Sequence, residues 1–98
     1  MNIFEDLYFN DEKPSVLTIH NNDRINVIAI GLKKGQVLKK HVTPFPALLV
    51  VLKGLISFDM EGVQTEIPLS GTFDIPANVP HEVTAMEESI FMVTKEKS

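Results

Sequence analysis

Short apolar segments alternate with turn residues along most of the chain. After residue 14 the apolar runs are separated by turn signals at intervals of about 8 to 12 residues, a spacing typical of all-β sandwiches and barrels. Val, Ile and Thr are frequent, and their β-branched side chains favour strands over helices. We predict nine strands, over Val16–His20, Ile25–Leu32, Val37–Val42, Ala47–Lys53, Leu55–Met60, Val63–Ile67, Thr72–Ile75, His81–Ala85 and Ser89–Thr94.

These strands leave no room for crossover helices in a chain of 98 residues, so the sheets are expected to be antiparallel. Ahead of them, Ile3, Phe4, Leu7 and Tyr8 recur at helical spacing. We therefore predict a short N-terminal helical segment whose apolar stripe packs on the sheets.

The composition narrows the classes of function. With 44% hydrophobic residues in 98, the chain can form one domain with a modest core. Its formal net charge of −4 argues against nucleic-acid binding, which usually needs a basic excess. The absence of cysteine excludes disulfides and thiolate chemistry. No apolar run approaches the roughly 20 residues that span a bilayer, and no signal-peptide pattern is seen, so we expect a cytoplasmic protein without membrane contact.

Two segments carry a characteristic spacing of Gly, His and Pro. The first, Gly35–Gly54, keeps the full spacing of the pattern G-x5-H-x-H-x3-E-x6-G, with His41 at the first histidine position. The second, Gly71–Ala85, follows G-x5-P-x-G-x2-H-x3-N with one residue fewer before Pro76 and with Asn78 in place of the glycine. Together they resemble the two motifs of the cupin superfamily, and especially its small single-domain members.

The resemblance implies a fold. It predicts an all-β, cupin-type (jelly-roll) antiparallel β-barrel with a short N-terminal segment. Residues 1–98 would form a single cupin domain, with motif one over residues 35–54 and motif two over residues 71–85.

The resemblance also implies positions for metal ligands, which in metal-bearing cupins are two histidines and a glutamate of motif one and the histidine of motif two. His41 and His81 occupy two of these positions, whereas Thr43 and Ala47 replace the second histidine and the glutamate. Zinc and non-haem iron sites usually need at least three protein ligands. We expect either no metal, or Fe, Ni, Zn or Mn held weakly by His41 and His81.

The two histidines suggest a ligand pocket. We expect them to project from opposing strands into one apolar cavity, where a few polar groups orient a small molecule. The expected lining is His41, Thr43, Ala47, Leu49, Val51, His81 and Val83. This favours a small-molecule-binding protein. The alternative is a metal-dependent isomerase or dioxygenase with His41 and His81 as ligands, and no catalytic residue is identified for either.

Other polar residues stay open as contributors to the site. Strand alternation does not exclude Asp59, Glu61, Glu66, Asp74 or His20 as a further ligand. The lysines at positions 33, 34, 39 and 40 have two interpretations. They form either a basic rim that attracts an anionic ligand or, as we favour, a solvated hairpin. Because Lys39 shares the parity of His41, we expect it alone of these four to reach the mouth of the barrel.

A homodimer is the expected assembly. Small cupins commonly pair, and the apolar N-terminal residues exceed what one barrel of this size covers. These residues are Ile3, Phe4, Leu7, Tyr8 and Phe9.

Overall fold

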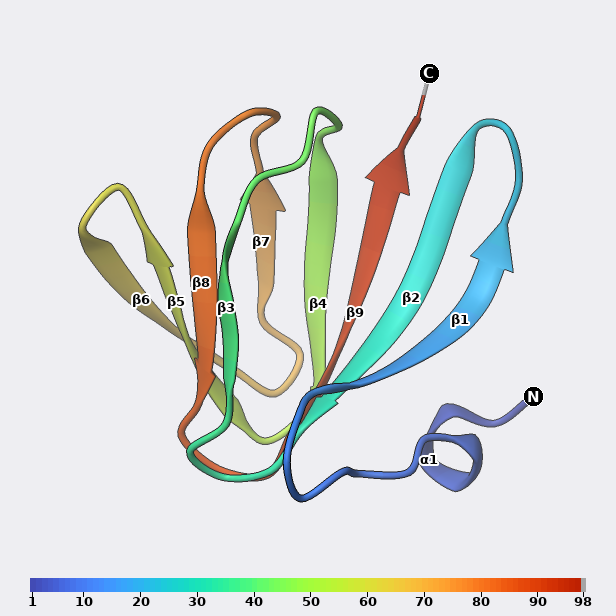
Figure 1. The fold of residues 1–98 in the computed structure, drawn as a ribbon, viewed down its shortest axis with the longest axis vertical. Coiled ribbons are helices and arrows are strands. Elements are labelled where there is room, and N and C mark those ends of the chain that lie inside the picture. Colours follow the sequence, from blue (N-terminus) through green and yellow to red (C-terminus); the bar gives the residue numbers. More distant parts are fainter. Residues whose placement is uncertain (98) are drawn as a thin grey trace.

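The computed structural model describes residues 1–97 and contains, within them, one short helix and nine strands (Figure 1). The elements are α1 Ile3–Asp6, β1 Ser15–Asn21, β2 Ile25–Leu32, β3 Val37–His41, β4 Ala47–Lys53, β5 Leu55–Met60, β6 Val63–Pro68, β7 Thr72–Ile75, β8 His81–Ala85 and β9 Ser89–Glu96. The all-β prediction is confirmed, and β9 continues two residues beyond its predicted end at Thr94.

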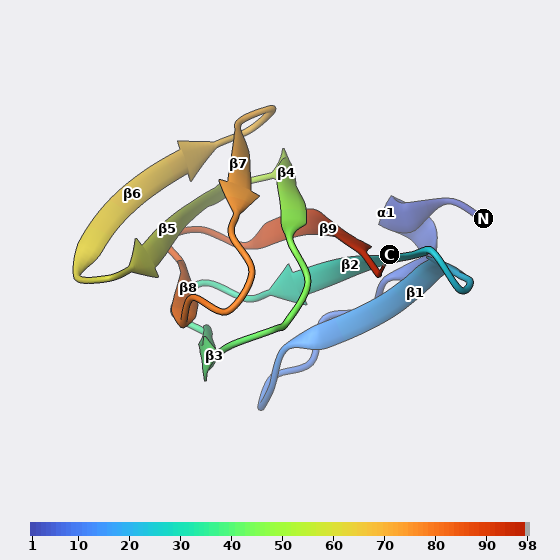
Figure 2. The same ribbon diagram turned by 90° about the horizontal axis from the view of Figure 1, so that it is seen from above.

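The strands form two antiparallel sheets that face each other, as seen from above in Figure 2. One sheet has five strands in the order β1-β2-β9-β4-β7, and the other has four in the order β3-β8-β5-β6. Within residues 1–97 no strand pairing joins one sheet to the other. The antiparallel two-sheet arrangement is thus established, whereas closure into a barrel stays a prediction.

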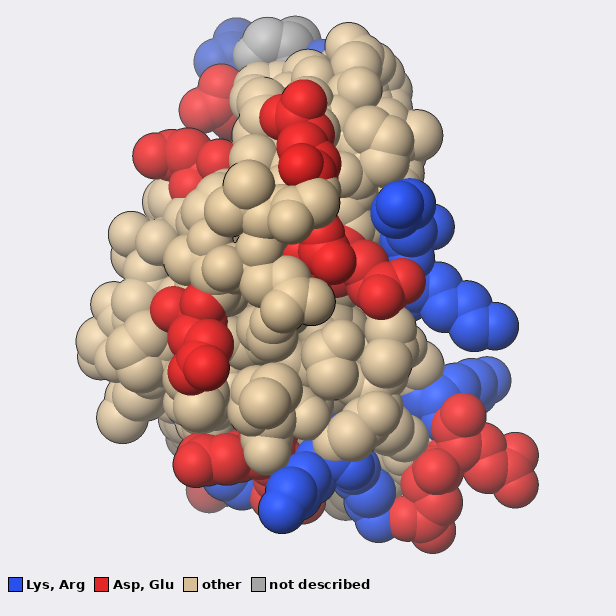
Figure 3. Space-filling view, turned by 90° about the vertical axis from the view of Figure 1, so that its left-hand side faces the viewer, with Lys and Arg blue, Asp and Glu red and all other residues tan. Residues whose placement is uncertain are grey.

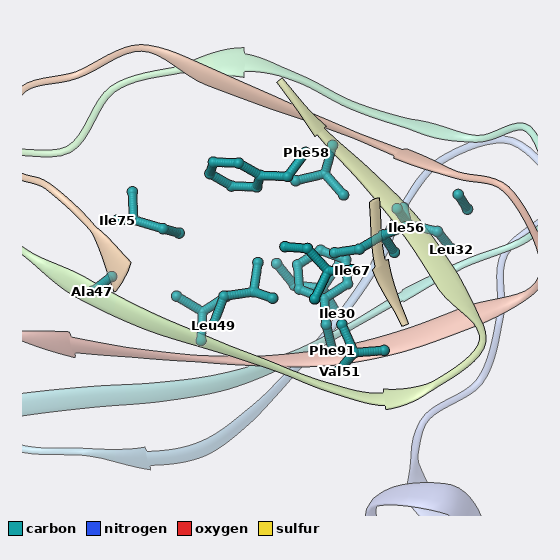
Figure 4. Packing of buried hydrophobic residues seen from close by; sticks show 13 residues of the cluster. Ile30, Leu32, Ala47, Leu49, Val51, Ile56, Phe58, Ile67, Ile75 and Phe91 are labelled. Atoms are coloured by element: carbon teal, nitrogen blue, oxygen red, sulfur yellow. The ribbon is translucent and has the colours of Figure 1, made fainter. Parts of the chain in front are cut away.

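Inward-facing side chains from both sheets fill the space between them. Alternation along β4 buries Ala47, Leu49 and Val51 on this inner face. Figure 4 shows Ala47 and Ile75 at one end of the packed cluster and Ile56 towards the other. The apolar pattern of the strands therefore produces one continuous core along the length of the sheets.

The N-terminal segment packs on the outer face of the five-stranded sheet. Leu7 is buried there against residues of β2 and β9. Gly31 permits the close approach, because a Cβ at that position would lie only 2.4 Å from Leu7 Cδ2. Phe4 and Tyr8 remain 59% and 80% exposed. The segment thus covers its own sheet, and the homodimer stays a prediction that rests on these two side chains.

Charged side chains lie mainly on the outside of the molecule. On the face drawn in Figure 3, carboxylates are scattered over a largely uncharged surface, and basic side chains project along one side. Two surface ion pairs, Lys33 with Asp11 and Lys53 with Glu88, join distant segments. Among residues 1–97 there is no helix of the length and apolar character required to cross a membrane.

Candidate functional site

The ends of five strands meet at one edge of the two sheets, at the top of Figure 1. A cavity lies between the sheets there, and we call this edge its mouth. The residues that these strand ends contribute are His41 of β3, Ala47 of β4, Ile75 of β7, His81 of β8 and Lys95 of β9.

A β-bulge in β3 sets the direction of His41. Leu38 pairs with Val83 of β8, and His41 pairs with His81. The two pairs are therefore three residues apart on β3 but only two residues apart on β8. The extra residue resets the alternation, so that both Leu38 and His41 line the cavity. Lys39 is exposed and lies outside the cavity. The prediction that Lys39 shares the face of His41 is wrong, because simple alternation fails across a bulge.

His41 and His81 are direct cross-strand partners. Their ring centroids lie 4.3 Å apart with an interplanar angle of 63°, an edge-on contact. The prediction that they project from opposing strands is wrong. The end of β3 and the start of β8 are antiparallel neighbours within the four-stranded sheet, so the two rings lie side by side in the cavity lining, with His81 buried and His41 exposed. Phe58 stacks beneath His81, with centroids 5.5 Å apart.

Hydrogen bonds to the backbone orient both imidazoles. Nδ1 of His81 lies 3.0 Å from the carbonyl oxygen of Val79, and Nδ1 of His41 lies 3.0 Å from that of Lys39. A carbonyl can only accept, so each Nδ1 carries the proton, and Nε2 keeps a lone pair in the neutral ring. Burial lowers the pKa of His81, the hydrogen bond to Val79 opposes this shift, and the charges of His41 and then Lys95 lower the pKa further.

The two loops at the mouth are tied together. The backbone N–H of Asn78 donates to the carbonyl oxygen of Thr43 at 2.8 Å. Asn78 has a φ of 64°, in the left-handed region that Asn tolerates better than most residues. This bond holds Thr43 against the cavity although β3 has already ended at His41. The motif-two loop therefore positions a residue of motif one.

The structure brings most of the expected pocket residues together. About 40 Å³ of the cavity is open to the centre of a water molecule. Since one water needs roughly 10–15 Å³ of such volume, the cavity holds about three waters. Its lining includes His41, Thr43, Ala47, Leu49, His81 and Val83. Val51 differs from the prediction: it shares the inward face of β4 but lies deeper, 1% exposed in the packed core.

Solved structures resemble this arrangement closely. No family model matches the sequence, and no curated protein matches it. An RmlC-like cupin protein from Desulfovibrio desulfuricans superposes with a TM-score of 0.91 at 24% identity, covering 99% of this chain and 94% of that one. The chain has a cupin fold. KdgF from Halomonas sp. shares this cupin fold with a TM-score of 0.87 at 15% identity, covering 100% and 93% of the two chains.

A third similar structure comes from Klebsiella pneumoniae and is an uncharacterized conserved protein with a double-stranded β-helix domain. It has a TM-score of 0.91 at 16% identity, and the match covers 99% of this chain and 88% of that one. At such identities the likeness establishes the cupin fold alone.

Lys95 is the charged site residue that sequence reasoning missed, beside apolar lining residues such as Leu38 and Ile75. It follows Phe91 and Val93 at two-residue intervals along β9, and all three line the cavity of this cupin fold. The predicted strand ended at Thr94, because the charged residues after it suggest solvent. The alternation of Phe91 and Val93 was the signal that could have extended the strand to Lys95.

No carboxylate of the described chain lines this cavity. The open candidates for a further ligand lie elsewhere: His20 contacts Asn22, and Asp74 is exposed on β7. Asp59, Glu61 and Glu66 are likewise absent from the lining. The side chain of Glu82, next to His81, turns outward and accepts from the backbone N–H of Lys40 at 3.2 Å.

The donor set fits a tightly held divalent metal poorly. Two neutral Nε2 atoms would be suitable ligands, and their Nδ1 bonds to carbonyls are the usual support for metal-binding histidines. However, within residues 1–97 no three His, Asp, Glu or Cys side chains lie close enough together to share one ion. Lys95, in the same lining, adds a positive charge that opposes a cation.

Proposed function

We propose that this protein binds a small molecule in the cavity between its sheets, with the ligand in contact with His41, Thr43 and His81. One observation carries the proposal: two imidazoles in direct contact enter an otherwise largely apolar, partly open cavity. A few convergent polar groups in an apolar pocket are the usual features of a ligand site.

The lining indicates the size and polarity of such a ligand. A volume of about three waters accommodates roughly four to six non-hydrogen atoms if the side chains stay in place. Leu49, Val83 and Phe91 offer apolar contacts below the mouth, while the neutral Nε2 atoms accept hydrogen bonds. A short molecule with one polar end and one apolar end matches both properties.

The alternative function is a metal-dependent isomerase or dioxygenase with His41 and His81 as ligands. One observation favours it, the two Nε2 atoms left free by the Nδ1 hydrogen bonds. The absence of a carboxylate in the lining and the presence of Lys95 oppose it. Elemental analysis of untagged protein separates the two functions: we expect far less than one metal ion per chain, and a stoichiometric Fe, Ni, Zn or Mn would favour the enzyme.

Titration with butyrate and with butyramide, followed by methyl NMR, tests the binding function directly. Either probe should shift the methyl signals of Leu49 and Val83 in the cavity. The signals of Leu17 and Ile19, which pack in the outer cluster under the N-terminal segment, serve as internal controls. If neither probe moves the cavity signals more than the outer ones, the proposed function is wrong.

A further inference from the structure

The charge of the cavity lining is opposite in sign to that of the whole chain. The chain has a formal net charge of −4. Yet Lys95 is the one Lys, Arg, Asp or Glu residue among the described residues that line the cavity. The other polar side chains of the lining are the two imidazoles and the hydroxyl of Thr43, so the lining contains a cation without a counter-charge.

The position of Lys95 leaves this charge available to a ligand. Lys95 pairs with Ala47 on the adjacent strand β4, and the small alanine leaves room beside the lysine stem. Two other lysines form ion pairs with carboxylates: Lys33 pairs with Asp11, and Lys53 pairs with Glu88. No Asp or Glu side chain of residues 1–97 forms an ion pair with Lys95.

An ammonium group at the edge of an apolar cavity attracts anions more strongly than one in open water, because the effective dielectric constant there is lower. The same charge disfavours a cationic ligand. Hydrogen bonds to charged groups also contribute roughly twice as much as those between neutral groups. A ligand anion at the mouth would gain both contributions, with its apolar part in contact with the walls below.

We propose that the ligand of this cavity is a short-chain carboxylate, held at the mouth by Lys95 and the hydroxyl of Thr43 with its apolar chain towards Phe58. This inference rests on the proposed binding function and names its ligand class. Lys95 lies on β9 of the five-stranded sheet, whereas His41 and His81 lie on β3 and β8 of the four-stranded sheet. Because the Nε2 lone pairs would repel a carboxylate, the anion is placed against Lys95, and the hydroxyl of Thr43 reaches it from the imidazole side.

The test compares butyrate with butyramide, which has nearly the same shape and no charge, by NMR titration at pH 8, where ordinary imidazoles are neutral. We expect butyrate to bind wild-type protein at least about tenfold more tightly. Lys95→Met keeps the stem and removes the charge, so it should abolish this preference. Lys39→Met is the matched control: it removes the same charge from an exposed position beside the mouth, and it should keep the preference.

The outcomes separate the two proposals. Equal affinities for the two probes in wild-type protein, or a preference for butyramide, would overturn the carboxylate assignment and leave small-molecule binding intact. A preference for butyrate that survives in Lys95→Met, or that is lost equally in Lys39→Met, would also overturn it. Binding of neither probe would overturn both proposals. The wild-type comparison needs no variant, so the test holds even if Lys95→Met folds poorly.

Discussion

The two ends of the space between the sheets differ in packing although the same strands form both. At the closed end Val51, Ile56 and Leu32 are at most 1% exposed and fill the core. At the mouth, Ala47 of β4 and His81 of β8 point inward and border a cavity. Along β4 the inward side chain at the mouth is the small Ala47, whereas Leu49 and Val51 below it are larger, so position along a strand decides between core and cavity.

This difference separates stability from binding. Closed-end side chains contact each other on all sides, and removing one leaves a sealed void. Mouth side chains already border open volume, so a truncation there enlarges a space that water can enter. The closed end should therefore carry most of the folding free energy, while the mouth can change its chemistry at smaller cost.

The largest expected effect comes from truncating the closed end. Ile56→Ala should lower the free energy of unfolding by about 2–5 kcal/mol, because a buried isoleucine is lost and a cavity is left behind. Ile75→Ala, a cavity-lining position at the mouth, should cost clearly less. Urea unfolding of both variants measures the difference. Equal losses would show that the two ends are packed alike.

The next effect concerns the mouth as an incomplete metal site. The double variant Thr43→His, Ala47→Glu restores the two ligands that the cupin motif lacks here, and we expect Ni²⁺ or Zn²⁺ to bind at least about 100-fold more tightly than to wild type. Because Ala47 pairs with Lys95, the new carboxylate would partly neutralise that lysine. Adding Lys95→Met should strengthen binding further.

Calorimetric titration of the metal into wild-type, double and triple variants provides the measurement, with each single substitution as a control. Equal affinities of the folded wild-type and double variants would mean that positions 43 and 47 do not cooperate with the two histidines.

A smaller effect is expected in the pH dependence of stability. Burial lowers the pKa of His81 from its ordinary 6.5, so near that pH the unfolded chain binds more protons than the folded one. The free energy of unfolding should therefore fall as the pH drops from above 6.5 through the lowered pKa. His81→Gln should flatten this dependence. Urea unfolding at pH 7.5, 6.5 and 5.5 checks the prediction, which fails if His81→Gln keeps the wild-type slope.

The smallest effect belongs to a region outside both ends, the exposed side chains of Phe4 and Tyr8. Changing both to serine should alter the free energy of unfolding of the monomer by no more than about 0.5 kcal/mol, as is usual for surface positions. It should nevertheless convert the expected homodimer to a monomer. Light scattering at micromolar concentration measures the mass, and a wild-type particle with the mass of a single chain would contradict the dimer.

The fold could be predicted from the sequence because alternation and turn residues act locally. Each predicted strand needed only its own apolar run and the turn residues that border it. The register of β3 against β8 could not be predicted, because the bulge between Leu38 and His41 leaves no sign in the apolar pattern.

Motif spacing specified the polar residues of the candidate site other than Lys95, and strand alternation added apolar ones such as Leu49 and Val83. His41, Thr43 and His81 came from the motif and lie together at the mouth. Lys95 lies outside both motifs, in a charged stretch that resembles a solvated terminus. Val51 was assigned to the pocket because alternation reports which face a residue occupies, but not its depth along the sheet.

The bulge in β3 also has an evolutionary consequence. It places two adjacent residues, Lys39 and Lys40, on the solvent side immediately before a histidine that faces the ligand cavity. Substitutions at these two positions can therefore change the surface charge or contacts with other molecules without changing the side chains that line the pocket. A deletion of either residue would remove the bulge and restore simple alternation, in which Leu38 and the histidine, then two residues apart, still face the cavity together. The bulge should therefore tolerate both a substitution at these two positions and the loss of one of them, without turning the histidine away from the cavity.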